Sequence, residues 1–490
     1  MQEQHTPEKI RRVANLLGDL FQEYYVQPEN RGVVAHRSKQ ELVNAVRERA
    51  PREGKDLEAV LREFKEKVMD VSVKTWHPLF FNQMSAGACL SAVVGDALSS
   101  MINATMATWE MSPAGTLIER TVAEWMARIL GMPEGSGGIV LPGGSMANLL
   151  ALTVARNRRL GMDVAKKGLA CLDRDVAIMS SEASHYSIAN AANLLGIGMD
   201  RVIKVGTNHR NEMLFEDFKH QFERAQREGI RVFAAVVTLG STVTGGYDPL
   251  ESIARFCRDR DIHVHVDAAF GGGLALSSQR DTYFAGVEYA DTIIWDVHKW
   301  LYAPLTGTVL LAPNPGIFKQ VFSTNANYIF HPQQEALDFA DDLGQHTLLC
   351  GKRLDTLATW FLFKTLGENH LRDVVESRVQ LGHDFYRLLE RDADFEPSYE
   401  PISPLQCFRF RPKTLIDAEP AYSDGLHRWV REQVKIRNVA MFNITKFKGA
   451  DHFRLVLINP LTSAQHLRDV LEKTRAICRE YLHLHPMFAT

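Results

Sequence analysis

The sequence predicts an α/β protein whose main domain contains a largely parallel sheet. Between about residues 76 and 370, short apolar runs rich in β-branched residues alternate with longer amphipathic stretches, a pattern typical of βαβ units covered on both faces. The chain has 490 residues, enough for two or three domains, with 45% hydrophobic and 23% charged residues. The predicted strands are GIVL (138–141), VAIMS (176–180), VFAAVVTL (232–239), IHVHVD (262–267), TIIW (292–295) and TVLLA (308–312).

The two ends of the chain differ from this central pattern. Residues 1–75 are charged and mainly helical in character, with a polar stretch between two amphipathic segments. Residues 371–490 contain a long helical pattern, the strand-like segments FRFRP and FRLVLINP, and a final amphipathic helix. The sequence therefore predicts an N-terminal helical segment (1–75), a large domain (76–370) and a small C-terminal α+β domain (371–490).

Charge and cysteine content exclude several classes of protein. Lys and Arg total 56 against 59 Asp and Glu, a formal charge of −3, so neither nucleic acid nor a membrane is expected as a partner. The six cysteines are too far apart for a zinc knuckle, a redox dithiol or a disulfide scaffold. The first twenty residues lack the apolar core of a signal peptide. We expect a cytoplasmic protein.

The segment LPGGSMANLL (141–150) joins a predicted strand to a predicted helix. Two glycines allow close approach of a ligand to the backbone, and the helix start offers N–H groups to an anion such as phosphate. Gly144 and Ser145 are the candidate phosphate-binding residues. The segment is neither G-x-G-x-x-G nor a Walker A loop, so no nucleotide is implied. The alternative is an ordinary turn in which Ser145 caps the helix.

In IHVHVDAAFGGG (262–273), Asp267 ends an apolar strand and is followed by alanines and glycines. His263, His265 and Asp267 lie on one face of this strand, because side chains alternate with period two. This arrangement permits a metal site, but no further ligand cluster accompanies it. We expect no metal, and a buried polar strand instead.

Lys299 follows the strand TIIW and lies among aromatic and apolar residues. Partial removal from water favours the uncharged, nucleophilic form of an amine. The alternative is a surface lysine with only its stem buried. His185, in SSEASHYSIANAA (180–192), also follows an apolar strand, where an imidazole could stack on a flat ring and transfer protons. The alternative interpretation of His185 is a histidine at the start of a helix with no chemical role.

Ligands of an open α/β sheet bind beyond the carboxyl ends of its strands, where these residues are expected to meet. An amine (Lys299), a carboxylate (Asp267) and a phosphate cup (Gly144 and Ser145) are the three anchors that pyridoxal 5'-phosphate requires. The sequence therefore predicts this cofactor. The anchors by themselves also suit a transaminase, an aldolase or a desulfurase on the same fold.

Longer segments resemble a known family. HVDAAFGG, DVHKW (296–300), TLGSTVTGGYDPL (238–250) and SPAGTLIE (112–119) resemble the pyridoxal-phosphate-dependent amino acid decarboxylases of the glutamate and aromatic amino acid decarboxylase group. The resemblance runs from about His77 to near the C-terminus. HPLFFNQMSAG (77–87) and FRLVLINP (453–460) are most similar to the glutamate and cysteine sulfinate branch.

The resemblance implies a fold-type I enzyme that decarboxylates an acidic L-amino acid to its amine and carbon dioxide. It implies a homodimer with each active site between two subunits. The cofactor residues it implies are Lys299 for the covalent bond, Asp267 for the ring nitrogen, His185 and Ala269 on the two ring faces, Thr242 nearby, and Gly144, Ser145 and His298 at the phosphate. Tyr328 would protonate the substrate carbon, and Gln83 with Arg454 would hold the distal carboxylate.

The chain departs from the family pattern at two informative places. Asp296-Val297 stands where better-known animal members have Asn-Pro, which affects one phosphate contact. Ala107 stands where the glutamate and cysteine sulfinate enzymes have an aromatic wall of the substrate pocket, so an aromatic or diamino acid substrate stays open. The residues also leave open a non-catalytic relative that keeps the fold, and a metal hydrolase built on His263, His265 and Asp267.

Overall fold

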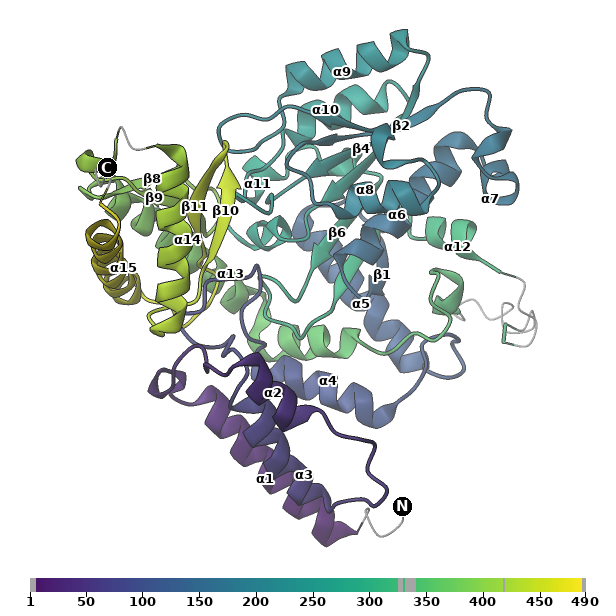
Figure 1. Ribbon diagram of the computed structural model, residues 1–490. Coiled ribbons are helices and arrows are strands. Elements are labelled where there is room, and N and C mark those ends of the chain that lie inside the picture. The colour runs from purple at the N-terminus through teal and green to yellow at the C-terminus, as the bar shows by residue number, and fades with distance from the viewer. Residues whose placement is uncertain (1–5, 325–328, 331–340, 417–418, 487–490) are drawn as a thin grey trace. The chain divides into compact units, whose positions relative to one another are not determined.

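The computed structural model describes residues 6–324, 329–330, 341–416 and 419–486. The chain forms two compact units: unit 1 (residues 1–87, 384–398 and 407–490) and unit 2 (residues 88–383 and 399–406). The sequence predicts three consecutive segments, whereas the structure groups the N-terminal residues with the C-terminal ones. Figure 1 shows the elements of both units.

Unit 2 contains a seven-stranded sheet with the order β1-β7-β6-β5-β4-β2-β3. β7 is antiparallel to both of its neighbours, and the other pairings are parallel. The strands are β1 (Gly137–Leu141), β2 (Val176–Ser181), β3 (Val202–Val205), β4 (Arg231–Thr238), β5 (His263–Asp267), β6 (Thr292–Asp296) and β7 (Thr308–Ala312).

Helices cover both faces of this sheet. Figure 1 shows α9 (Phe215–Arg227) and α10 (Leu250–Arg258) on one side of the strands and α6 (Gly144–Leu160) and α8 (Ser187–Leu194) on the other. The remaining helices of unit 2 are α4 (Leu90–Ile102), α5 (Pro113–Leu130), α7 (Asp163–Lys167), α11 (Arg280–Tyr283) and α12 (Gly316–Phe322). α13 (Thr356–Glu390) runs from unit 2 into unit 1 and is interrupted at Gly367, whose φ is +74°. None of the described helices combines the length and the apolar character needed to cross a bilayer.

The predicted α/β fold is confirmed, and all six predicted strands are present. The sequence does not predict β3, because its four residues VIKV are a short run broken by Lys204. The sheet is buried by two apolar clusters that share α6. One cluster packs α6 and α12 against β1, β6 and β7, and the other packs α6 and α8 against β2 and β4. α6 is therefore held firmly against the central strands.

Unit 1 contains a four-stranded sheet with the order β10-β11-β9-β8. Its N-terminal segment is joined to the C-terminal part of the chain by paired hydrogen bonds. The side chain of Asn438 accepts from the Val34 amide at 2.9 Å and donates to the Val34 carbonyl at 2.7 Å. The elements are α1 (Pro7–Tyr25), α2 (Lys39–Val46), α3 (Leu57–Phe64), β8 (Phe395–Pro397), β9 (Leu405–Phe410), α14 (Pro420–Ile436), β10 (Asn443–Phe447), β11 (Ala450–Val456) and α15 (Ala464–Leu484).

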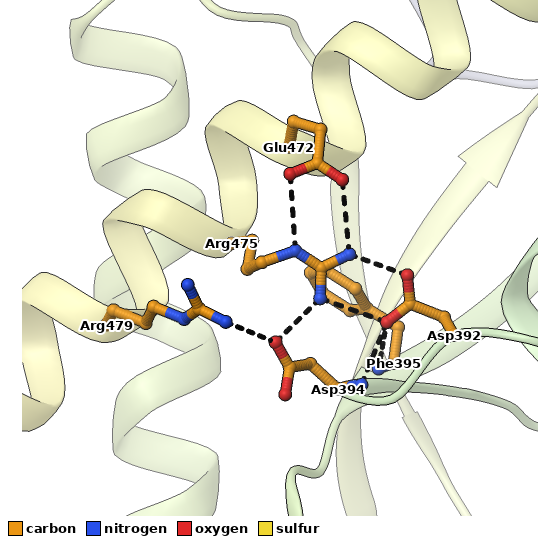
Figure 2. Close-up of polar contacts among 6 residues, drawn as sticks. All are labelled: Asp392, Asp394, Phe395, Glu472, Arg475 and Arg479. Atoms are coloured by element: carbon orange, nitrogen blue, oxygen red, sulfur yellow. Dashed lines mark hydrogen bonds and ion pairs between the residues drawn. The ribbon is translucent and has the colours of Figure 1, made fainter.

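A cluster of charged side chains fastens α15 to the chain before β8 (Figure 2). Arg475 donates to both oxygens of Asp392, at 3.0 and 2.6 Å, and to Asp394 at 2.7 Å. Arg479 adds a single bond of 3.0 Å to Asp394. Burial by itself raises the pKa of Asp392, but bonds from Arg475 and from the amides of Asp394 and Phe395 outweigh it and lower the pKa below 3.8.

Candidate active site

The strands of unit 2 end at a common edge where polar side chains meet. In the sheet register, Thr238 at the end of β4 lies beside Asp267 at the end of β5, and Asp267 lies beside Ile294 of β6. Lys299 follows β6 by three residues. The parallel register therefore brings Asp267 and the segment carrying Lys299 to the same edge, as the sequence predicts.

Lys299 forms an ion pair with Asp296. The Lys299 Nζ lies 2.9 Å from Asp296 Oδ2, and 23% of the lysine side chain is exposed. Asp296 is buried, and its Oδ1 accepts a hydrogen bond from the Thr308 hydroxyl. His298 Nε2 lies 3.6 Å from Asp296 Oδ2. The sequence predicts a partly desolvated lysine between aromatic and apolar residues, and the structure adds an ion pair between its amine and the carboxylate three residues earlier.

The glycine turn lies beside the same carboxylate. Gly143 has φ +102° and is the residue that caps α6, so Ser145 does not cap this helix. A Cβ atom on Gly144 would lie 3.2 and 3.3 Å from the two oxygens of Asp296, so a side chain here would crowd that carboxylate. Ser145 is exposed at the first turn of α6. The backbone N–H groups of this turn suit an anion.

Asp267 is buried and accepts hydrogen bonds at both oxygens. The Ala269 amide donates to Oδ1 at 3.1 Å, and the Asn148 side chain donates to Oδ2 at 3.0 Å. A carboxylate held by two donors keeps a fixed orientation at the end of β5. Ala269, predicted to cover one face of the cofactor ring, is also buried.

His185 precedes α8 and is close to the charged groups of the site. Its Nδ1 lies 2.8 Å from the Ser187 hydroxyl. Burial lowers the pKa of His185, Asp267 raises it, Lys299 lowers it, Asp296 raises it, and the net result is below 6.5. Hydrogen bonds link His185 to Asp267, because the Asn148 side chain donates to Asp267 at 3.0 Å and to the Ser187 hydroxyl at 2.8 Å.

The two histidines of β5 are engaged in hydrogen bonds. His263 Nε2 and His265 Nδ1 each lie 2.9 Å from the Thr292 hydroxyl, and His265 Nε2 lies 2.8 Å from the Asn148 side-chain oxygen. Burial lowers the pKa of His263 to about 3 and also lowers the pKa of His265. In the part of the chain that the structure describes, no group of three His, Cys, Asp or Glu side chains is arranged to hold a metal ion.

The other predicted residues that the structure describes belong to both units. Thr242 is exposed in the loop after β4, and buried His298 has its Nδ1 2.9 Å from the Gly307 carbonyl oxygen. Tyr328 lies outside the described residues. Gln83 and Arg454 belong to unit 1. There the segment before Gln83 runs beside β11, because the Val456 amide donates to the Phe81 carbonyl at 3.0 Å.

The sequence does not predict two polar residues of the site, Asn148 and Ser187, or the pairing of Asp296 with Lys299. Asn148 bonds Asp267, Ser187 bonds both His185 and Asn148, and Asp296 bonds Lys299. The sequence does contain a signal for Asn148. This residue is the one amide among the small and apolar residues of MANLLAL, and it lies one helical turn after Gly144. The acid at position 296 stands out in the sequence, but its pairing with Lys299 is visible only in the structure.

These residues fit pyridoxal 5'-phosphate. A buried carboxylate that only accepts hydrogen bonds suits a protonated ring nitrogen, and a primary amine lies at the same edge of the sheet. A glycine turn at the start of a 17-residue helix suits a phosphate group. Lys299, Asp267, Gly144 and Ser145 are therefore the residues that could hold the cofactor.

Known proteins are similar to this chain in sequence and fold. Residues 40–411 match the family model described as the pyridoxal-dependent decarboxylase conserved domain. Acidic amino acid decarboxylase GADL1 of Xenopus tropicalis is 31% identical over 420 residues, which are 84% of this chain and 81% of that protein. Mouse CSAD is 28% identical with a TM-score of 0.87, covering 95% of this chain and 99% of that one. Oryza sativa TDC with PLP and tryptamine shares the fold, with a TM-score of 0.90 at 23% identity over 97% and 99% of the two chains.

Proposed function

Because the chain belongs to the family of pyridoxal-dependent decarboxylases, we propose that it removes the α-carboxyl group of an acidic L-amino acid, with Lys299, Asp267 and His185 at the reacting centre. The chain is an amino acid decarboxylase that uses pyridoxal phosphate. The proposed residue roles rest on one observation: His185, Asp267 and Lys299 lie at or just after the carboxyl ends of β2, β5 and β6, which are parallel strands of the sheet in unit 2.

Pyridoxal phosphate, when bound, accepts the electron pair left by the departing carboxylate. Lys299 would supply the amine that attaches the cofactor. Asp296 would hold this side chain whenever its amine is free and protonated, because Asp296 Oδ2 lies 2.9 Å from Lys299 Nζ. The ion pair holds the lysine close to its point of attachment.

Asp267 keeps a proton on the ring nitrogen of the cofactor, since a buried carboxylate held by two donors prefers a cationic partner. His185 and Ala269 would cover the two faces of the ring. Gly144, Ser145 and His298 would hold the phosphate, and Thr242 would lie close to the cofactor. Support for these roles comes from the glycine turn at the α6 start and from the burial of Asp267, Ala269 and His298.

Arg454 and Gln83 bind the distal carboxylate of the substrate. A guanidinium can grip a carboxylate through two parallel hydrogen bonds, which gives both charge and orientation. Arg454 is buried on β11, and burial strengthens the attraction between a guanidinium and a carboxylate. The relatives named as acidic amino acid decarboxylases support the same substrate class. Tyr328 delivers the proton to the α-carbon.

The active form is a homodimer located in the cytoplasm, with each site completed by the second subunit. Four large apolar side chains of α4 are exposed, Leu90, Val94, Met101 and Ile102, and such a group is typical of a protein interface. The six free cysteines agree with a reducing compartment. Sedimentation of the purified protein should give twice the 55.2 kDa of one chain, and a monomer in the presence of cofactor would refute the dimer.

The decarboxylation is tested with purified protein, pyridoxal phosphate and a mixed panel of amino acids. The panel contains glutamate, aspartate, cysteine sulfinate, tyrosine and diaminobutyrate, and mass spectrometry identifies the amines formed. An amine from one of the three acidic members is the expected result. An amine from tyrosine or diaminobutyrate alone would keep the reaction but overturn the substrate class, and would point to the small side chain of Ala107 as the cause.

A further inference from the structure

We propose that Asn148 is a positioning residue that holds Asp267 in its orientation and, through Ser187, sets the tautomer of His185. The inference rests on the roles proposed above for Asp267 and His185, which lie at the cofactor ring. Asn148 is buried within α6, and its side chain joins the strand that ends in Asp267 to the segment that carries His185. The Asn148 amide would therefore position both Asp267, proposed to face the ring nitrogen of the cofactor, and His185, proposed to cover one face of that ring.

The orientation of the Asn148 amide follows from its neighbours. Its Nδ2 lies 3.0 Å from Asp267 Oδ2 and 2.8 Å from the Ser187 hydroxyl, while its Oδ1 lies 2.8 Å from His265 Nε2. A carboxylate only accepts hydrogen bonds, so the atom that faces Asp267 must be the amide nitrogen. Both amide hydrogens are then donated, one to Asp267 and the other to Ser187.

The proton positions along the branch to His185 follow in turn. The Ser187 backbone N–H can only donate, and it donates to His185 Nδ1 at 3.3 Å, so this nitrogen is an acceptor. The Ser187 hydroxyl, which accepts from Asn148, therefore donates its own hydrogen to the same Nδ1, 2.8 Å away. A nitrogen that accepts two hydrogen bonds carries no proton, so the neutral imidazole has its proton on Nε2. The lowered pKa of His185 agrees with a neutral ring.

The branch into β5 locks the other side of the amide. Asn148 Oδ1 accepts from His265 Nε2, so His265 Nδ1 accepts from the Thr292 hydroxyl at 2.9 Å, and that oxygen accepts in turn from His263 Nε2 at 2.9 Å. His263, His265 and Thr292 are completely buried. A buried amide that flipped would leave several of these groups without partners, which is costly. Asn148 therefore has one orientation.

This arrangement has a chemical consequence for the proposed site. His185 presents an uncharged Nε2–H donor, and it is not a cation that would compete with the ring nitrogen for Asp267. Asp267 is prevented from rotating because one oxygen is held by the Ala269 amide and the other by Asn148. The network thus separates the two roles: Asp267 carries the negative charge, and His185 stays neutral beside it.

The tautomer is tested in the cofactor-free protein by ¹⁵N NMR with labelled histidine, the His185 signals being assigned by their loss in His185→Gln. We expect an unprotonated Nδ1 and a protonated Nε2. In Ser187→Ala the Nδ1 resonance should shift, because it loses the hydroxyl donor while Asn148 keeps its bond to Asp267. A protonated Nδ1 in the native protein, or unchanged His185 signals in Ser187→Ala, would overturn the proposed branch to His185.

The orientation of Asp267 is tested by the dissociation constant of pyridoxal phosphate. Asn148→Leu should raise it about tenfold, the effect of losing one hydrogen bond to a charged group. The matched control is Asn157→Leu, which removes another buried amide of α6 whose side-chain oxygen bonds Arg156 instead. Equal constants for the two leucine variants would overturn the role of Asn148. Asp267→Asn tests the proposed role of Asp267 separately from the role of Asn148. If Asp267→Asn does not weaken the binding of pyridoxal phosphate, the proposed role of Asp267 itself fails.

Discussion

The carboxylate of Glu119 and the ammonium of Lys352 lie 2.8 Å apart in the interior of unit 2, and together they bond both backbone polar groups of Val140. Glu119 accepts from the Val140 amide at 3.0 Å, and Lys352 donates to the Val140 carbonyl at 2.6 Å. β1 is the edge strand of the sheet, so these groups face no further strand. At Val140, four residues before Gly144, the ion pair supplies the hydrogen bonds that a neighbouring strand would otherwise provide.

Replacing Glu119 with Gln should destabilise the protein by about 3–5 kcal/mol, because it leaves the buried Lys352 ammonium without its charged partner. Urea unfolding of the variant and of the native protein measures the difference. Glu124→Gln, at an exposed position of the same helix, should change the stability by less than about 0.5 kcal/mol. Equal effects of the two variants would show that the ion pair does not contribute.

Lys299→Ala should abolish both the covalent attachment of pyridoxal phosphate and the formation of amine, because this side chain supplies the amine proposed to attach the cofactor. The absorption spectrum and mass spectrometry of the product measure the two effects. Lys204→Ala, on β3 of the same sheet, should retain both. Retention of attachment and turnover by Lys299→Ala would remove this lysine from the mechanism.

Arg454→Lys should lower kcat/KM for the acidic substrate by about 10–100-fold, since an ammonium cannot reproduce the paired hydrogen bonds of a guanidinium. The loss should appear mainly in KM. Steady-state kinetics with the substrate found in the amino acid panel provides the measurement. Arg409→Lys, on β9 of the same sheet in unit 1, is the matched control and should leave KM unchanged. Unchanged KM in Arg454→Lys would assign the distal carboxylate to another residue.

The buried His427 should make stability fall in mildly acidic solution. Burial lowers its pKa to about 4 from an ordinary 6.5, and its Nε2 accepts a hydrogen bond from the Phe410 amide at 3.1 Å. Below pH 6.5 the His427 imidazole binds a proton in the unfolded chain but stays neutral in the folded protein. The free energy of unfolding therefore falls as the pH falls from 6.5 toward 4. The contribution is roughly 2 kcal/mol at pH 5.

His427→Gln removes this contribution, so the free energy of unfolding should fall less steeply between pH 7 and pH 5 than in the native protein. His483→Gln, at an exposed position of α15, should leave the slope as it is. Unfolding by urea at several pH values gives the slopes. Identical slopes for His427→Gln and the native protein would contradict the prediction.

Arg475→Met should destabilise the protein by about 2 kcal/mol, because Asp392 and Asp394 lose hydrogen bonds from a largely buried guanidinium (Figure 2). The control is Arg479→Met, which removes a mostly exposed arginine with one bond to Asp394, and it should cost less than about 0.5 kcal/mol. Thermal or urea unfolding compares the two. A larger loss in Arg479→Met would reverse the assignment of the stabilising contact.

Much of the fold could be predicted from the sequence because its signals are local. The strands of unit 2 are continuous apolar runs, and the residues after them, such as Asp267 and Lys299, are identified by position alone. The sequence does not predict β3, because Lys204 interrupts its four-residue apolar run. The grouping of residues 1–87 with the C-terminal part depends on pairs such as Val34 and Asn438, which are 404 residues apart.

The sequence by itself determined the α/β fold and the cofactor, because the apolar strand runs and the motifs around Asp267 and Lys299 each consist of consecutive residues. The tertiary structure decided which polar groups are partners: Asp296 with Lys299, Asn148 with Asp267, and Glu119 with Lys352. Partners of this kind are selected by burial, since a buried polar group must be satisfied by whatever donor or acceptor the packing brings near it.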